Sequence, residues 1–587
     1  MLQRNNHSQG DNRALKRRRR ALPCSKTRPS SDPAMTEAAT HRVFNQVPDL
    51  AHYNLFATDP ALRGALERLG GGWHAGTLGQ FGARLGEPEV QQWAADANRH
   101  TPELHTHSRT GERIDAVDFH PSWHALLALL RSQQLQALPF AQPRAGAWVA
   151  RTAGYFLQAQ VESGSLCPPT MTFASIPVLR KETALFAELE PRLYATEHDA
   201  RDLPWRSKSA IMIGMGMTEK QGGSDVRANT TVARAVRGEG RGAEYALTGH
   251  KWFFSAPMCD AHLVVARMGA EDGPLSCFFV PRFRDDGSKN AVLIQRLKDK
   301  LGNRSNSSSE VEFRDATGIL IGEEGRGIPT IIEMATSTRL DCVIGSAAIL
   351  RAAFVQALHH ARHRSAFGRL LADQPLMRNV LADLALESEA ATLLMMELGH
   401  AFEHADDDPL AASWKRVVTP AAKFWVCKRT LEATGEAMEV WGGNGYVEEG
   451  PMARLYREAP VNSIWEGSGN IMCLDVLRAI QRNPDDAARL LQDLSRRAGG
   501  HPAVRAELAS LQALLRQPPE LLEASARRFA QGLVLTAQAA LMLAHADTEN
   551  AELFVASRLG RQHGRVFGTL DADADVLKRV FSRGFEG

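Results

Sequence analysis

The sequence lacks most of the features that mark specialised classes of protein. Its 587 residues include only seven cysteines, which are scattered along the chain and form no CxxC pair. An odd, dispersed set of this kind predicts neither a disulfide framework nor a zinc site. We therefore expect a protein of the reducing cytoplasm that has no structural metal.

Long hydrophobic runs and an excess of one charge are also missing. No uninterrupted apolar run reaches the roughly 18 residues of a membrane span, and the N-terminus lacks the apolar core of a secretory signal. The net charge of +2 argues neither for nor against nucleic acid. Because 44% of the residues are hydrophobic and 23% are charged, we expect a soluble globular protein without a membrane partner.

Residues 1–34 differ from the rest of the chain. They contain the basic run Lys16–Arg20, many polar residues and almost no aliphatic ones. Such a segment cannot bury enough apolar surface to fold, so we expect a disordered basic extension. It could contact phosphates, or be a solvated tail, a transit peptide or the product of an over-long reading frame, because Met35 precedes the first stretch of globular composition.

The remaining chain is too long for one core and divides by hydrophobic period into four regions. Apolar residues recur at helical spacing in 35–182, in 326–482 and in 483–587, whereas 183–325 contains short strand-like runs. These runs are 228–236, 244–248, 262–268, 276–281 and 311–315. They do not alternate with helices, and no GxGxxG follows a strand, which excludes βαβ winding and a Rossmann dinucleotide site. The sequence predicts a mainly α protein with a central β domain.

Two histidines at a predicted helix entry have a spacing that could serve a metal. His120 and His124 lie four residues apart, but no acid or third histidine completes a ligand set. We therefore expect them to pack or cap a helix.

Three stretches could bind a flat, phosphorylated ligand. In Met215–Asp225, the hydroxyls of Thr218 and Ser224 flank a glycine pair; the alternative is a polar β-turn. Three aromatic residues and a hydroxyl end the stretch Gly249–Ser255 and could line a planar ring; the alternative is a doubly buried strand. An arginine in Arg362–Gly368 could bind a phosphate, or lie exposed at a helix end.

A fourth stretch, Trp465–Asn470, combines a carboxylate with an apolar wall. Glu466 follows an indole and precedes a turn of small residues. An apolar wall disfavours a charged carboxylate and makes it a better proton acceptor. The alternative is a helix start capped by Ser468 or Asn470, with Glu466 as an ordinary first-turn acid.

In this order the stretches resemble the acyl-CoA dehydrogenase superfamily. The helical–β–helical layout is accompanied by Thr-Glu-x-x-Gly-Gly-Ser-Asp, Gly-x-Lys-x-x-x-Ser, Lys300–Arg304, Arg-x-x-Phe-Gly and Trp-Glu-Gly-Ser-x-Asn. The resemblance covers roughly residues 36–480. It is closer to the AidB-type flavoproteins of the adaptive response to alkylation, on the stretches Val43–Gln46, Gly214–Asp225, Leu297–Asn306 and Pro460–Arg478. That branch has an extra C-terminal helical domain, to which residues 483–587 correspond.

The resemblance implies an FAD site in a homo-oligomer, which we expect to be a tetramer. Glu466 occupies the position of the catalytic base, which removes the α proton of an acyl thioester. Arg364 and Gln374 would reach the FAD of a neighbouring subunit. The implied cofactor contacts in the chain itself are Met215, Gly216, Met217, Thr218, Gln221, Gly222, Gly223, Ser224, Phe253, Phe254, Ser255, Ile464, Trp465, Gly467, Ser468 and Asn470.

AidB-type proteins resemble flavoproteins of weak acyl-CoA dehydrogenase activity that associate with DNA. In residues 483–587 the basic residues are clustered and mostly arginine, which suits phosphate oxygens. The candidate DNA contacts are Arg527, Arg528, Arg558, Arg561, Arg565, Lys578 and Arg579. Without a recognisable DNA-reading motif, binding to double-stranded DNA should be sequence-neutral and salt-sensitive. Solvated helix faces are the alternative.

Three functions follow from these observations. The protein could protect DNA from alkylating agents, taking an acyl-CoA or an alkylating electrophile at its flavin. It could be an ordinary acyl-CoA dehydrogenase of short or branched-chain catabolism. It could also be a DNA-binding protein whose flavin is purely structural.

Overall fold

The computed structural model describes residues 40–560 and 564–587. The chain divides into two compact units, Met1–Gln46 and Val47–Gly587, and the helices and strands of the described residues lie in the second. The expectation of disorder in residues 1–34 concerns a segment outside the described residues.

The first region of the large unit is helical. Helix α1 begins where the Asp59 carboxylate accepts from the Leu62 amide (3.0 Å), and α4 begins where His120 accepts from the Ser122 amide. His120 therefore caps a helix, as expected. The helices are α1 (Pro60–Arg68), α2 (Ala75–Leu85), α3 (Pro88–Arg99), α4 (Pro121–Ser132), α5 (Leu138–Ala141), α6 (Ala147–Val161), α7 (Cys167–Leu179) and α8 (Thr183–Leu193).

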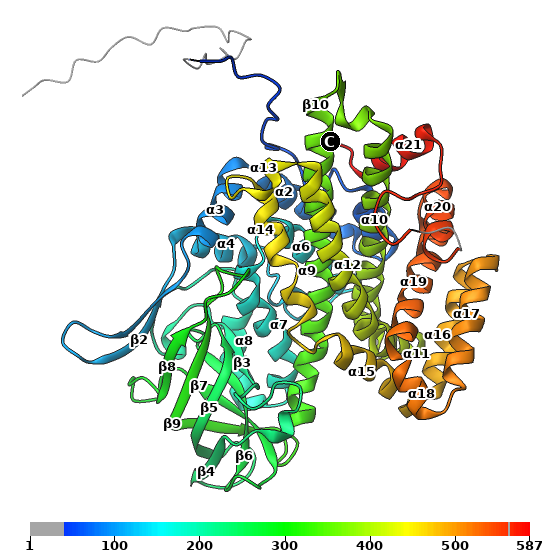
Figure 1. The fold of residues 1–587 in the computed structure, drawn as a ribbon. Coiled ribbons are helices and arrows are strands. Elements are labelled where there is room, and N and C mark those ends of the chain that lie inside the picture. Colours follow the sequence, from blue (N-terminus) through cyan, green and yellow to red (C-terminus); the bar gives the residue numbers. More distant parts are fainter. Residues whose placement is uncertain (1–39, 561–563) are drawn as a thin grey trace, which may run out of the picture. The chain divides into compact units, whose positions relative to one another are not determined.

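A β-hairpin interrupts these helices. Strand β1 (Glu103–His107) pairs antiparallel with β2 (Arg113–Asp118), and Figure 1 shows the hairpin extending beyond the neighbouring helices. Helical periodicity did not predict it. The alternating residues of β1 and the turn at Gly111, whose φ is 89°, were the local signals for a hairpin.

The central region is a closed sheet. Strand β6 pairs with both β4 and β7, so that β4, β5, β9, β7 and β6 form a ring, with β3 on β6 and β8 on β9. The strands are β3 (Ile213–Gly216), β4 (Val232–Arg237), β5 (Glu244–Ser255), β6 (Ala261–Met268), β7 (Leu275–Pro281), β8 (Val292–Leu297) and β9 (Ser308–Ile321). All five predicted strand runs overlap these strands.

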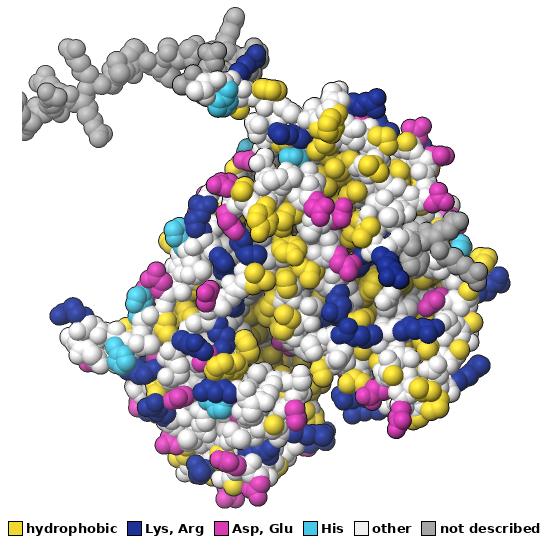
Figure 2. Space-filling view, in the orientation of Figure 1, with side chains coloured by type: hydrophobic (Ala, Val, Ile, Leu, Met, Phe, Trp, Pro, Cys, Tyr) yellow, Lys and Arg dark blue, Asp and Glu magenta, His cyan; other side chains and the backbone are white. Residues whose placement is uncertain are grey.

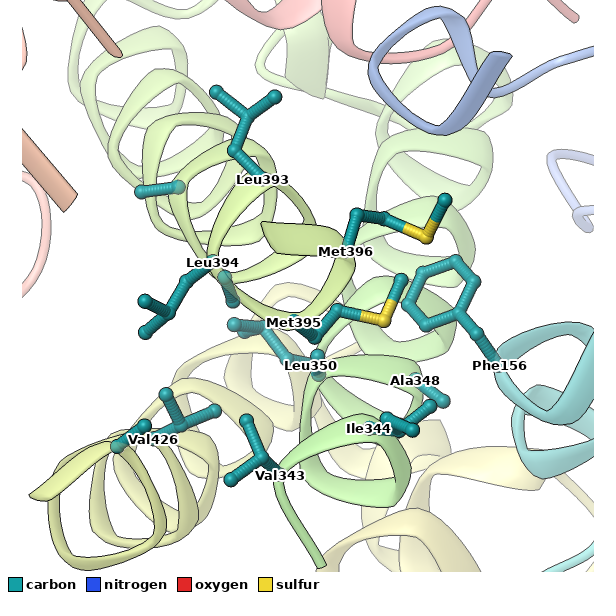
Figure 3. Close-up of a cluster of buried hydrophobic side chains, with 14 of the residues drawn as sticks. Phe156, Val343, Ile344, Ala348, Leu350, Leu393, Leu394, Met395, Met396 and Val426 are labelled. Atoms are coloured by element: carbon teal, nitrogen blue, oxygen red, sulfur yellow. The ribbon is translucent and has the colours of Figure 1, made fainter. Parts of the chain in front are cut away.

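Long helices form the centre of the molecule. Helix α9 (Gly327–His363) packs against α10 (Pro375–His404) and α12 (Thr419–Val440). Figure 3 shows Met395 and Met396 of α10 pointing toward Phe156 of α6. Among the described residues, α9 alone is long and apolar enough to cross a membrane, but 94% of its apolar window is buried in this core. It is therefore the core helix of the bundle.

Shorter elements connect the long helices. They are β10 (Ser365–Ala366), β11 (Arg369–Leu370), α11 (Pro409–Ser413), a π-helix (Trp414–Val418), α13 (Gly443–Tyr446), α14 (Pro451–Glu458) and α15 (Gly469–Arg482).

The C-terminal region continues the same core. Helix α19 packs on α10, α12 and α15, and α21 packs on α10 (Figure 1). Its buried side chains, such as Leu541 and Phe581, belong to one hydrophobic cluster with those of α6 and α9. The helices are α16 (Pro484–Arg497), α17 (Pro502–Leu515), α18 (Pro519–Ala524), α19 (Ala526–His545), α20 (Thr548–Arg558) and α21 (Ala574–Gly584).

Candidate flavin site and basic surface

Glu466 lies on a constrained turn between α14 and α15. Its φ of 58° is in the left-handed region, which costs energy for a residue with a side chain. Thr338 Oγ1 donates to Glu466 Oε2 (2.7 Å), and Arg339 Nε donates to the Glu466 carbonyl oxygen (3.0 Å). Lys423 Nζ donates to the Gly467 carbonyl oxygen (2.7 Å). Helices α9 and α12 thus fix the position of the carboxylate.

A second set of contacts supports this turn. Asp475 accepts from Arg339 (2.9 Å) and from Arg416 (2.9 Å). Burial acts to raise the pKa of Asp475, but the hydrogen bond and charge of Arg416 prevail and lower it. The Trp465 indole donates to Asn462 Oδ1 (3.0 Å). The residues that orient Glu466 are therefore themselves partnered.

Strand β5 contributes the opposite side of the site. A bulge between Lys251 and Phe254 breaks its pairing with β9, and Phe253 there is 54% exposed. Ser255 lies beside the buried Cys167 thiol and acts to lower the pKa of that thiol. Burial raises the pKa of Cys167 to about 12, and the nearby charge of Glu466 acts in the same direction. Ser255 of the β region and Glu466 of the helical region therefore both influence the pKa of Cys167.

Glu219 anchors the turn between β3 and β4. Its carboxylate pairs with Lys251 Nζ (2.7 Å), and both side chains are fully buried. It also accepts from the Thr230 amide and the Thr231 hydroxyl. Burial acts to raise the pKa of Glu219, but Lys251 and the other donors lower it to about 2. Sequence reasoning assigned no role to this residue, although it lies inside the Thr-Glu-x-x-Gly-Gly-Ser-Asp motif.

Several predicted flavin contacts have structural partners instead. Phe254 is fully buried and its ring stacks on His262 (centroids 4.0 Å apart), so only its backbone can face a cofactor. This corrects the expectation of a ring contact, because the bulge exposes Phe253 and turns Phe254 into the sheet. Gln221 Nε2 donates to Glu219 and to the Ala228 carbonyl oxygen. A Cβ on Gly216 would lie 2.6 Å from the Phe254 ring.

The remaining residues fit a flavin. Within the described part of the chain, the hydroxyls of Thr218 and Ser224 have no hydrogen-bond partner in the protein. These two hydroxyls are available at the turn, which suits a heteroaromatic ring that bears a phosphorylated tail. Gly222 and Gly223 leave the backbone of the turn accessible. Met215 and Met217 are partly buried against the core.

The turn after Glu466 is open to solvent. Ile464 is 64% exposed, and Ser468 and Asn470 are exposed too. Trp465 and Gly467 are half-buried. Arg364 and Gln374 flank the hairpin β10–β11, where Gln374 Nε2 donates to the Ala366 carbonyl oxygen (3.0 Å) and Phe367 is fully exposed.

The predicted DNA contacts fall into distinct groups. The side chain of Arg558 is only 11% exposed and pairs with Asp383 and with Glu387 (3.0 Å). The prediction that Arg558 contacts DNA is therefore wrong, because internal carboxylates already bind its guanidinium. Arg579 pairs with Glu549 (2.6 Å). Arg527 Nε donates to Asn470 Oδ1 (2.7 Å). Arg561 lies outside the described residues. Among the predicted contacts in the described chain, Arg528, Arg565 and Lys578 are exposed and have neither an ion-pair nor a hydrogen-bond partner.

No group of three or more metal-ligating side chains occurs in the described part of the chain. The six cysteines there are buried and free.

Comparison with known proteins assigns families to three segments. Residues 45–200 match the adaptive response protein AidB N-terminal domain. Residues 214–316 match the acyl-CoA dehydrogenase middle domain, and residues 325–481 match the acyl-CoA dehydrogenase C-terminal domain.

Two relatives span most of the chain. The AidB protein of Escherichia coli, named as an acyl-CoA dehydrogenase, is 47% identical over 527 residues, which cover 89% of this chain and 95% of that protein. Acyl-CoA dehydrogenase family member 11 of Caenorhabditis elegans is 29% identical over 453 residues, covering 74% and 72%.

Solved structures share the fold. The C. elegans protein ACDH-11, in complex with C11-CoA, superposes with a TM-score of 0.81 at 25% identity over 90% of this chain and 94% of that one. An acyl-CoA dehydrogenase of Bacillus anthracis complexed with FAD gives a TM-score of 0.58 at 17% identity over 79% and 81%. These similarities confirm the predicted acyl-CoA dehydrogenase fold.

Proposed function

The chain belongs to the AidB branch of the acyl-CoA dehydrogenase family, whose members bind FAD, and from this premise we propose that it binds double-stranded DNA and protects it from alkylating agents. We further propose that its acyl-CoA dehydrogenase-type activity is weak. The observation that carries the chemical part is the carboxylate of Glu466, which Thr338 and the hydrogen bonds to its turn hold in place. Exposed cations on the C-terminal helices support the DNA-binding part.

The contacts of Glu466 divide the roles of its two oxygens. Oε2 accepts a hydrogen bond from Thr338 (2.7 Å), which leaves Oε1 as the oxygen that can take a proton. Because Arg339 and Lys423 bind the carbonyl oxygens of the same turn, the carboxylate needs little reorganisation before it acts. Bound FAD supplies the acceptor for a hydride from the substrate. The proton removed by Glu466 is the α proton of an acyl thioester.

Protection of DNA requires the protein to lie on the duplex. Arg528, Arg565 and Lys578 are exposed and unpaired within the described chain, so their charges are available to phosphates. Contacts of this kind are independent of sequence and weaken as salt rises. A small alkylating electrophile would then meet the flavin site close to the DNA.

Assembly as a homotetramer is part of the proposal. Phe367, Leu376 and Tyr446 are exposed by 100%, 84% and 81% in the single chain. Large apolar side chains exposed to this degree are typical of surfaces that a partner covers. Figure 2 shows hydrophobic side chains gathered across one face of the molecule. Light scattering should therefore give the mass of four chains.

The activity of Glu466→Gln tests the chemical role. We expect the variant to reduce its flavin with acyl-CoAs about 10²- to 10⁴-fold more slowly than the wild type, because it lacks the general base. Survival of DNA treated with a methylating agent should fall as well. Unchanged protection would assign the flavin a structural role, and rapid wild-type reduction by one acyl-CoA would favour ordinary catabolism.

A further inference from the structure

Arg527 of the C-terminal region contacts the turn that carries Glu466. Its Nε donates to Asn470 Oδ1 at 2.7 Å, and Asn470 lies in the first turn of α15. This hydrogen bond joins α19 to a residue that the family resemblance places in the cofactor site.

Lys428 of α12 approaches the same turn. A Cβ on Gly469 would lie 3.1 Å from Lys428 Cε, so the lysine stem packs against the start of α15. Lys428 Nζ lies 5.9 Å from the centroid of the Phe424 ring, and the Arg527 guanidinium lies 5.7 Å from it. Two cations from different helices thus share one aromatic residue.

The charges of Arg527 and Lys428 both act on the thiol of Cys473. Burial raises the pKa of this thiol to about 11, and the charges of Arg527 and Lys428 act against that rise. Neither cation forms an ion pair with a carboxylate in the described part of the chain. Two neighbouring positive charges without an internal counter-charge are a site for an external anion.

We propose that Arg527 and Lys428 bind the diphosphate of FAD beside Asn470, so that the C-terminal region forms part of the cofactor site. In FAD the ribityl chain separates the diphosphate from the isoalloxazine ring. The cations that bind the diphosphate should therefore lie beside the ring site and not within it, as Arg527 and Lys428 do. Arg527 is held by Nε, which leaves the two terminal nitrogens of its fork to bind phosphate oxygens. The inference rests on FAD and is independent of DNA protection.

The test compares FAD with riboflavin, which has the same ring and no phosphate. Flavin is removed from the purified full-length protein, and the affinity for each compound is measured by fluorescence titration. Arg527→Gln and Lys428→Gln should each weaken FAD binding about tenfold, the effect of one charge-assisted hydrogen bond, and leave riboflavin binding unchanged. Arg528→Gln is the matched control, since Arg528 is the next exposed residue of α19 and does not contact Asn470.

Each alternative has a distinct result. Equal losses for FAD and riboflavin would mean that Arg527 only orders the turn. Normal FAD binding by both variants would also overturn the proposal. If Arg527→Gln retains FAD but loses DNA affinity as Arg528→Gln does, the phosphate belongs to DNA. Should Arg527→Gln fail to fold, as judged by circular dichroism, Lys428→Gln carries the same test.

Discussion

The segment around Glu466 and the C-terminal helices α19–α21 both contain clustered charges, yet the charges have different surroundings. Near Glu466, Arg339 is 10% exposed and contacts both the Glu466 turn and Asp475. In the C-terminal region, Arg558 is equally buried, whereas Arg528 of α19 and Arg565 of the segment between α20 and α21 are exposed. The clustering of arginines in the sequence therefore does not show which of them can bind a ligand. Pairing with buried carboxylates decides which arginines orient a structure and which can meet a ligand.

Loss of the buried arginine should give the largest effect. Arg558→Gln leaves the carboxylates of Asp383 and Glu387 buried, with Arg429 as the remaining cation beside Glu387. We expect a loss of about 3 kcal/mol in the free energy of unfolding, measured by denaturant titration. Arg528→Gln, the exposed counterpart, should change it by less than about 0.5 kcal/mol. If the two variants lost similar amounts of unfolding free energy, the division into internally paired and exposed arginines would be wrong.

Glu458, in the helix before the Glu466 turn, tests how strongly this region is shielded from water. Burial, then the charge of Glu162, raises the pKa of Glu458 from 4.5 to about 7. A raised carboxyl pKa stabilises the fold fully below the unfolded value, and this contribution is lost as pH rises through the folded value. Wild-type stability should therefore decline between about pH 4.5 and 7 because of this group.

Glu458→Gln should remove that decline. Between pH 5 and pH 8, the variant should gain roughly 2–3 kcal/mol of unfolding free energy relative to the wild type. The Asn303 amide, which donates to Glu458 Oε1 (2.9 Å), can donate to the glutamine oxygen in the same way. The exposed Glu448→Gln in the same segment serves as control. An unchanged pH dependence would place Glu458 in contact with solvent.

Removal of the exposed cations should have the smallest effect on stability and a specific effect on DNA binding. The triple variant Arg528→Gln, Arg565→Gln and Lys578→Gln should unfold within about 0.5 kcal/mol per site of the wild type. The slope of log affinity against log salt should fall by roughly 0.9 for each phosphate contact removed. Arg237→Gln on the β region is the control, and an unchanged slope in the triple variant would locate DNA elsewhere.

The spacing of apolar residues predicted the long helices well, because burying one face of a helix requires that spacing. The region 326–482, which its apolar spacing predicted to be helical, contains α9 (Gly327–His363) and α10 (Pro375–His404). The hairpin β1–β2 was missed because it is short and lies between helices. The closure of the sheet through β6 was also beyond sequence reasoning, since pairing partners lie far apart in the chain.

The sequence by itself determined the order of the domains, the motif residues and the identity of the carboxylate on the Glu466 turn. Local chemistry suffices for these, because helical period, glycine turns and motif spacing are properties of neighbouring residues. Only the tertiary structure decided that Phe253 and not Phe254 offers its ring, that Glu219 is an anchor, and that Arg558 is internal. Each of these depends on which distant side chain fills the space beside it, and spacing along the chain carries no such information.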